Sequence, residues 1–306
     1  MKAVTLWHGD CLELMKNISD GSVDLVLTDP PYGTTACKWD SVIPFEPMWE
    51  QLNRIIKPNG AICLFGSEPF SSALRMSNIK HFKYDWVWEK EQGANFMLCK
   101  YQPYKVHEIV SVFSKATHKY FPQMTDGKPY ISGKGTSGDI TGNVKKIQTK
   151  NDGKRYPRSI QKFCTDKSKS KHPTQKPIAL LEYLIRTYTN EGETVLDFTA
   201  GSMSTVIACI NTNRNCIAIE KDDHYFSVGC ERVHNHILDN NIDMKILQLD
   251  EGYFDIAKER IEKSICAGAK NAPCFTAANA GSSTRGRRMM TFAATEKDYE
   301  KDTNDK

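Results

Sequence analysis

Val23-Asp-Leu-Val-Leu-Thr28, followed directly by Asp29-Pro-Pro-Tyr-Gly33, carries the clearest structural signal in this chain. The first six residues are apolar and β-branched enough to predict a strand, and the motif begins where that strand ends. In open α/β sheets, ligands bind at the carboxyl ends of strands. The two prolines fix φ and remove two N–H donors, so these residues offer no N–H group that would compete for the nearby carbonyl oxygens. With the Asp29 carboxylate and the Tyr32 ring, this turn offers acceptors to an amino group and a stacking face to a base; the plainer alternative is a proline-rich turn.

Six other short apolar runs alternate with helical patterns on both sides of this segment. They are residues 4–7, 60–65, 84–88, 108–113, 194–197 and 215–220. Between them, Trp49, Leu52 and Ile55 keep helical spacing before Lys57-Pro-Asn-Gly60, and Pro177 stands where a second helical pattern begins. This alternation predicts an α/β fold with seven strands in a mostly parallel sheet that has helices on both faces.

Composition excludes several classes of protein. The chain has 306 residues, 40% of them apolar and 25% charged, which fits one large domain or two small ones. It contains no apolar run of about 18 residues, so we expect no membrane span. The start MKAVTLWHGD lacks the apolar core of a secretory signal. Ten cysteines without a CxxC pair favour neither a zinc ribbon nor a disulfide scaffold, so we expect no metal site and a cytoplasmic location.

Charge is concentrated in one segment. Residues 115–171 hold 14 Lys and Arg against 4 Asp and Glu, whereas the rest of the chain has a net charge of −6. The strand rhythm also stops there, which predicts an insert outside the sheet. Such an insert is either a solvated loop or a surface that binds a polyanion such as nucleic acid. Residues 266–306 are rich in Ala, Gly, Ser, Thr and charge, and predict a disordered tail.

Three motifs in this order resemble the β-group of DNA amino-methyltransferases, which modify adenine N6 or cytosine N4. They are the segment from Gly9-Asp-Cys11 to Asp29-Pro-Pro-Tyr32, the segment Lys171-His-Pro-Thr-Gln-Lys-Pro177, and Val195-Leu-Asp-Phe-Thr-Ala-Gly-Ser-Met-Ser-Thr205. The resemblance covers about residues 1–114 and 171–235. It implies a Rossmann-like S-adenosylmethionine-dependent methyltransferase fold with a circularly permuted seven-stranded sheet. Residues 1–114 would be the catalytic half, 115–171 the target-recognition insert and 172–265 the cofactor-binding half.

The resemblance also assigns roles to individual residues. Asp29, Pro30, Pro31 and Tyr32 would be catalytic, with the flipped adenine stacked on Tyr32. The positions that it assigns to S-adenosylmethionine are Asp10, His172, Thr174, Gln175, Lys176, Asp197, Thr199, Gly201, Ser202 and Glu220. Of these, Asp10 would face the adenine of the cofactor, while His172, Thr174 and Lys176 would contact its methionine end. Glu220 ends a strand 19 residues after Gly201, a spacing that suits a ribose diol; otherwise it is an ordinary carboxylate.

The cofactor motif departs from the family pattern at two places. Phe198-Thr199 replaces the usual Pro-Phe, and Met203 stands where the family has glycine. A side chain makes positive φ costly, so the loop either takes another backbone shape or binds the cofactor less well.

The expected reaction is methyl transfer to adenine N6 in double-stranded DNA after base flipping. Asp29 favours adenine because the cytosine-N4 group often has serine at that position, and cytosine-N4 transfer stays the main alternative. RNA or protein-amide methylation and an inactive DNA-binding protein on the same fold are the others. The resemblance also suggests three expectations that stay open: that the protein forms a homodimer, that it has a cognate restriction endonuclease, and that it associates with the nucleoid.

Overall fold

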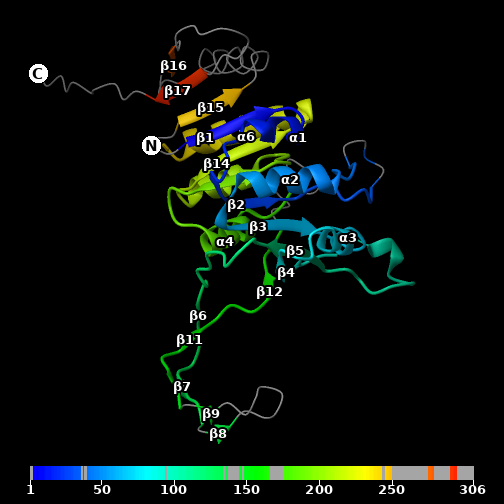
Figure 1. Ribbon diagram of the computed structural model, residues 1–306, viewed down its shortest axis with the longest axis vertical. Helices are drawn as coiled ribbons and strands as arrows, with labels where there is room; N and C mark the ends of the chain where they lie inside the picture. The colour runs from blue at the N-terminus through cyan, green and yellow to red at the C-terminus, as the bar shows by residue number, and fades with distance from the viewer. Residues whose placement is uncertain are drawn as a thin grey trace, which may run out of the picture.

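One mixed sheet organises the chain. The computed structural model describes residues 3–35, 37, 40–93, 95–133, 135–136, 145–146, 148–165, 175–242, 245–249, 275–278 and 290–294. The strand order across the sheet is β12-β4-β5-β3-β2-β13-β14-β1-β15-β17-β16 (Figure 1). The strands of this sheet are β1 Ala3–His8, β2 Val23–Thr28, β3 Ile56–Gly66, β4 Phe82–Glu89, β5 His107–Phe113, β12 Ile160–Lys162, β13 Thr194–Asp197, β14 Asn215–Glu220, β15 Lys245–Leu249, β16 Phe275–Ala278 and β17 Met290–Ala294.

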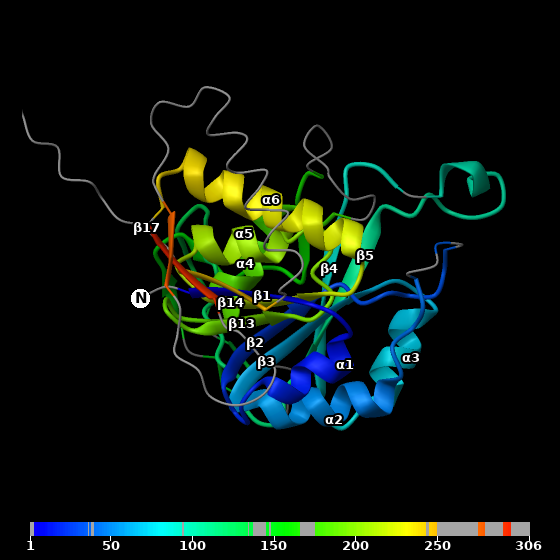
Figure 2. The same cartoon turned by 90° about the horizontal axis from the view of Figure 1, so that it is seen from above.

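Helices cover both faces of the sheet, as Figure 2 shows: α4, α5 and α6 lie on one face, and α1, α2 and α3 lie on the other. Their bounds are α1 Cys11–Leu14, α2 Phe45–Ile55, α3 Phe70–Ser77, α4 Ile178–Tyr188, α5 Ser204–Asn211 and α6 Asp223–Asp239, with short 3₁₀ turns at Met15–Asn17 and Phe96–Leu98. Strand β2 is buried along its whole length. Its Leu25 and Leu27 join the core under α4 and α5, whereas Val26 between them joins the core under α2. Alternate side chains of one strand therefore hold both layers.

The permuted order of the chain places its two halves side by side. Strand β2 pairs in parallel with β3 on one side and with β13 on the other. The chain after β2 leads to α2 on one face, and the chain after β13 leads to α5 on the opposite face. A crevice opens at the carboxyl ends of two such strands, and this is where open α/β sheets bind ligands. The expected fold class is confirmed.

The sheet is larger than the seven strands expected from the sequence. All seven are present, although β3 begins at Ile56 instead of Gly60. Strand β12 shows that the insert is not wholly outside the sheet, since it pairs with the edge strand β4 and satisfies backbone groups that would otherwise be unpaired. Strands β16 and β17 fall in the tail expected to be disordered, so that expectation is wrong for these two ranges; the other residues of 266–306 lie outside the described residues.

Besides β12, the described part of the insert contains three antiparallel strand pairs. They are β6 Thr125–Asp126 with β11 Lys154–Arg155, β7 Tyr130–Ile131 with β10 Lys150–Asn151, and β8 Gly135–Thr136 with β9 Lys145–Lys146. Together they reach away from the sheet as one long arm (Figure 1). Tyr130 and Tyr156 are exposed on it, and the Arg155 guanidinium lies 4.8 Å from the centre of the Tyr130 ring. The arm therefore combines positive charge with exposed aromatic rings.

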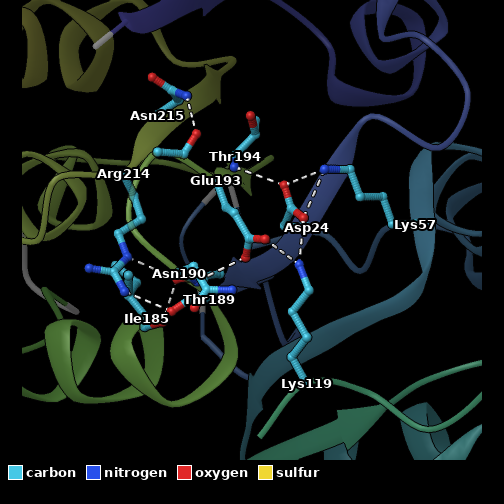
Figure 3. Close-up of polar contacts among 11 residues, drawn as sticks. Asp24, Lys57, Lys119, Ile185, Thr189, Asn190, Glu193, Thr194, Arg214 and Asn215 are labelled. Atoms are coloured by element: carbon cyan, nitrogen blue, oxygen red, sulfur yellow. Dashed lines mark hydrogen bonds and ion pairs between the residues drawn. The ribbon is translucent and has the colours of Figure 1, made fainter. Parts of the chain in front are cut away.

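A buried aspartate fastens the root of this arm to the sheet (Figure 3). Asp24 on β2 is only 1% exposed, and its carboxylate accepts from Lys57 Nζ at 2.8 Å and from Lys119 Nζ at 3.0 Å. The backbone N–H of Thr194 donates to the same carboxylate at 3.1 Å. Lys119 also pairs with Glu193. Burial alone would raise the pKa of Asp24, but these donors outweigh it and the pKa is lowered.

Candidate active site

A cavity of about 870 Å³ lies at the carboxyl ends of the central strands. Its lining includes Glu220 at the end of β14, Gly201 after β13, Asp29 after β2 and Glu108 on β5, so it crosses the junction between the two halves of the chain. This volume is within the usual range for small-molecule sites, about 300–1,000 Å³. Pro30, the second residue of the motif, lines it as well.

Asp29 is held by groups from three different segments. Its carboxylate pairs with Lys176 Nζ and accepts from the Tyr32 hydroxyl, while its carbonyl accepts from Thr199 Oγ1 at 3.0 Å. Desolvation by the surrounding protein raises the pKa of this carboxyl despite the opposing charge of Lys176. The Tyr32 ring stacks on Phe70, with centroids 5.0 Å apart and planes inclined by 26°. The site thus presents an acceptor with a raised proton affinity beside an aromatic ring whose position is fixed.

A second aspartate shapes the loop that carries Tyr32. The Asp40 carboxylate accepts from the backbone N–H groups of Tyr32, Gly33, Thr34 and Thr35, at distances from 2.7 to 2.9 Å. Burial would raise the pKa of Asp40, but these donors lower it below its usual value. Gly33 takes φ +67, and a Cβ there would stand 2.8 Å from Val42, so the turn needs glycine.

For the methyl transfer that the sequence resemblance implies, we expect Asp40→Ala to reduce kcat about 10- to 100-fold, with little change in the dissociation constant of S-adenosylmethionine. Four N–H groups would lose their acceptor, and a loop that shifts by about 1 Å can cost a hundredfold in rate. Asp40→Asn keeps one acceptor oxygen, so its kcat should lie between that of the wild type and that of Asp40→Ala. Steady-state methyl transfer and calorimetric cofactor binding would check this; a loss of cofactor affinity that accounts for the whole effect would contradict it.

Glu220 organises the other end of the cavity. One carboxylate oxygen accepts from the Gly201 N–H at 2.6 Å, and the other accepts from the N–H groups of Lys221 and Asp222 at 2.9 and 2.8 Å. Gly201 has φ +51, which suits this tight approach. Asp10 caps α1 through the Leu12 N–H and pairs with Lys221 at 3.1 Å. Two carboxylates and a glycine turn therefore border this end, and the carboxylates are acceptors that suit the hydroxyls and amines of a nucleoside.

Met203 adopts the left-handed backbone that a glycine would take, with φ 59 and ψ 37. The expectation that its side chain might force another backbone shape is wrong. The residue is fully buried, and its side chain packs against Gly229 of α6, where a Cβ would approach the Met203 Cγ to 2.7 Å. A left-handed residue costs about 1–2 kcal/mol, whereas burying a methionine gains about 1.5–3 kcal/mol, so packing offsets the strain.

Asp197 joins β13 to β2 below the cavity. It is 4% exposed, accepts from Thr28 Oγ1 at 2.5 Å and accepts from the Thr199 N–H at 3.2 Å. Burial raises the pKa of this carboxyl to about 6, although these hydrogen bonds oppose the change. The folded protein therefore binds this proton more tightly than the unfolded chain does.

A pH-dependent difference in stability follows for Asp197→Asn. The stability that the Asp197 proton contributes is fully present below the unfolded pKa, about 3.9, and is lost as pH rises through about 6. Asparagine does not titrate, so the free energy of unfolding of the variant minus that of the wild type should rise by up to about 3 kcal/mol between pH 4 and pH 7. Denaturant unfolding of both proteins across this range would measure it, and a constant difference would refute it.

The structure brings together most of the residues singled out from the sequence. The cavity is lined by Asp10, Asp29, Pro30, Pro31, Tyr32, Gln175, Lys176, Asp197, Thr199, Gly201, Ser202 and Glu220. His172 and Thr174 lie outside the described residues. Gln175 accepts from Ser202 Oγ at 3.3 Å, which links the segment before α4 to the cofactor loop. Lys176, assigned to the methionine end of the cofactor, has its ammonium on the Asp29 carboxylate.

Sequence reasoning missed several charged residues that line this cavity, among them Asp40, Lys90 and Glu108. Lys90 follows β4 and Glu108 lies on β5, where the two strands pair antiparallel. Each is an unremarkable charge in its own segment, and no local pattern marks it. The apposition of strands from separate parts of the chain reveals the role of Lys90 and Glu108, whereas Asp40 acts within its own loop.

The fold and the cavity define an α/β enzyme of the Rossmann-like class, with an acidic acceptor placed beside a nucleoside-sized pocket. The chain belongs to the N6/N4-methyltransferase family of DNA methylases, whose family model matches residues 23–231. A relative is the type II methyltransferase M2.MboI of Moraxella bovis, 27% identical over 275 residues that cover 80% of this chain and 93% of the relative.

Solved structures agree with this assignment. The complex of M1.HpyAVI with SAM (S-adenosylmethionine) is 25% identical with a TM-score of 0.52, covering 75% of this chain and 99% of the other. The cytosine-N4-specific PvuII DNA methyltransferase is 18% identical with a TM-score of 0.57, covering 78% and 89%, and this likeness concerns the fold alone. Among the described residues, no helix is long and apolar enough to cross a bilayer.

Proposed function

We propose that this DNA methylase transfers a methyl group from S-adenosylmethionine to the N6 amino group of adenine in double-stranded DNA. The observation that carries the proposal is Asp29, a carboxylate with a raised pKa at the catalytic end of a cavity whose other end holds Glu220 and Gly201. The carboxylate acceptors at that far end fit the hydroxyls and amine of the nucleoside part of the cofactor. S-adenosylmethionine, when bound, supplies the methyl group.

The residues of this chain would act on the base. The flipped adenine would rest on the Tyr32 ring and donate from its amino group to the Asp29 carboxylate and the Pro30 carbonyl. These acceptors draw the nitrogen toward a tetrahedral form and free its lone pair. As the methyl group arrives, positive charge develops on nitrogen, and Asp29 is already oriented to stabilise it. One N–H bond then breaks, its electrons stay on nitrogen, and the raised pKa favours transfer of the proton to Asp29.

The insert at residues 115–171, which contains the arm, is proposed as the DNA-recognition element. Its net charge of +10 suits phosphate contacts, and its exposed tyrosines suit contact with bases or sugars. The boundaries proposed around it, with a catalytic half at 1–114 and a cofactor half at 172–265, follow the strands that flank it. A homodimer, a cognate restriction endonuclease and a cytoplasmic, nucleoid-associated location stay predictions.

Product analysis tests the proposal. Unmethylated genomic DNA would be incubated with the protein and methyl-labelled S-adenosylmethionine, then digested to nucleosides and separated. We expect label in N6-methyl-2′-deoxyadenosine. Label in N4-methyl-2′-deoxycytidine would keep the site and the reaction but overturn the base, since cytosine N4 is an amine of the same geometry. Absence of label in both nucleosides would overturn the proposal as a whole.

A further inference from the structure

Asp29 shares its cationic partner with a second carboxylate. Lys176 Nζ pairs with Asp29 Oδ2 and lies 3.3 Å from Glu108 Oε2. The other oxygen of Glu108 pairs with Lys90. The carboxylates and ammonium groups thus alternate along one chain of contacts, in the order Asp29, Lys176, Glu108 and Lys90. The charges of the four ionised groups sum to zero.

All four side chains are withdrawn from water. Their exposed fractions are 8% for Lys176, 23% for Asp29, and 14% for both Glu108 and Lys90. Lys176 also lies over the Phe65 ring, with its Nζ 5.2 Å from the ring centre. Its backbone is set by Pro177, the cap residue of α4. The ammonium therefore lies between the two carboxylates that face it.

The two contacts of Lys176 are not equivalent. The contact with Asp29 is a hydrogen bond, whereas the contact with Glu108 has an ion-pair distance without hydrogen-bond geometry. Within the described part of the chain, Glu108 Oε2 is buried and accepts no hydrogen bond. Burial would raise the pKa of Glu108, but Lys176 and Lys90 outweigh it and lower the pKa, so the group is ionised. Glu108 is therefore a charged acceptor with unused capacity beside the catalytic carboxylate.

This arrangement answers a problem that the proposed reaction creates. Each oxygen of the Asp29 carboxylate already accepts one hydrogen bond, from Tyr32 and from Lys176, so an incoming amino group competes with the Lys176 ammonium. The charge of Asp29 also disappears when it takes the proton. Leaving a buried ammonium without a partner is strongly unfavourable. A nearby second carboxylate lets the ammonium keep a partner throughout.

We propose that Glu108 is a positioning residue that receives the Lys176 ammonium when the target base binds, and so releases the Asp29 carboxylate for the amine. The inference rests on the proposed function. It assigns Lys176 to control of the catalytic carboxylate and gives Glu108 a role that acts through Lys176.

The test begins with Glu108→Gln, which keeps the shape and removes the charge. We expect kcat for methyl transfer to fall about 100-fold, because Lys176 would stay on Asp29. The dissociation constant of S-adenosylmethionine should change less than about 2-fold, which also shows that the variant folds. Glu108→Asp keeps the charge and should recover at least about 10-fold of the lost rate. The matched control is Glu89→Gln at the end of β4, a 45% exposed carboxylate 3.7 Å from Lys162, with an expected change under about 2-fold.

A double-mutant cycle separates this role from simple support of the fold. In a Lys176→Met background, Glu108→Gln should cost less than about 3-fold in kcat, because no ammonium remains to be received. An undiminished 100-fold loss in that background, or equal losses in Glu108→Asp and Glu108→Gln, would overturn the inference. If the wild type labels DNA and Glu108→Gln is fully active, only this inference fails. If the wild type labels no DNA, the proposed function itself fails.

Discussion

Asp29→Ala should abolish methyl transfer to DNA, with a loss of at least about 10³-fold in kcat, and should leave binding of S-adenosylmethionine within about 2-fold. The variant removes the group that both stabilises the charge on nitrogen and accepts its proton, and each effect is typically worth 10²-fold or more. The cofactor end of the cavity is formed by Glu220 and Gly201 and does not depend on Asp29. Asp29→Ala should therefore lose the rate of methyl transfer while it keeps its affinity for S-adenosylmethionine.

The ion pairs around Asp29 make this variant interpretable. When Asp29 is removed, Lys176 still has Glu108 beside it, so no buried ammonium is left alone. We therefore expect Asp29→Ala to fold. Asp29→Asn keeps the shape and one acceptor but no charge, and should lose at least about 10²-fold. Single-turnover transfer to unmethylated DNA would measure both rates; an Asp29→Ala protein with a tenth of the wild-type rate would refute the role of this residue.

Asp24→Ala should destabilise the fold by about 2–4 kcal/mol without touching the active site. The Thr194 N–H would lose its acceptor, and Lys119 would keep only Glu193. Removing one partner of a buried pair costs about 3–5 kcal/mol, and the partial exposure of both lysines reduces this figure.

The matched control for Asp24 is Asp20→Ala, whose side chain is 77% exposed and pairs with Arg54 at the surface. That change should cost less than about 1 kcal/mol. Urea denaturation of the three proteins would give the free energies of unfolding. Because Lys119 stands at the root of the arm, hydrogen exchange in residues 115–133 should also speed up in Asp24→Ala. Equal stability of Asp24→Ala and Asp20→Ala would contradict the role given to this network.

Much of the fold can be predicted from the sequence because its signals are local. The apolar run 23–28 has a strong strand propensity of its own, and the two prolines that follow limit how far the strand extends. The same holds for 194–197 and 215–220, which appear where the pattern places them. Short-range sterics and hydrophobic periodicity therefore determined the α/β class and the position of the motif at a strand end.

Local patterns misjudge the segments whose structure depends on a partner. Residues 160–162 have no strand signal of their own, yet they pair with β4 because an edge strand offers free backbone groups. Met203 breaks the rule that positive φ needs glycine, since its buried contact with Gly229 compensates for the strain. Both outcomes depend on neighbours that are remote in the sequence.

The sequence by itself predicted the residues to which we assign the chemistry, namely Asp29 to Tyr32 and the glycine turn at 201. The tertiary structure alone decided that Asp40 holds the loop of Tyr32 and that Glu108 stands beside Lys176. Lys176 is 147 residues from Asp29 along the chain, and the two meet through folding of the permuted sheet. Long-range contacts of this kind depend on the order of the strands in the sheet and on which charges are buried together. No local stretch of residues determines either of these.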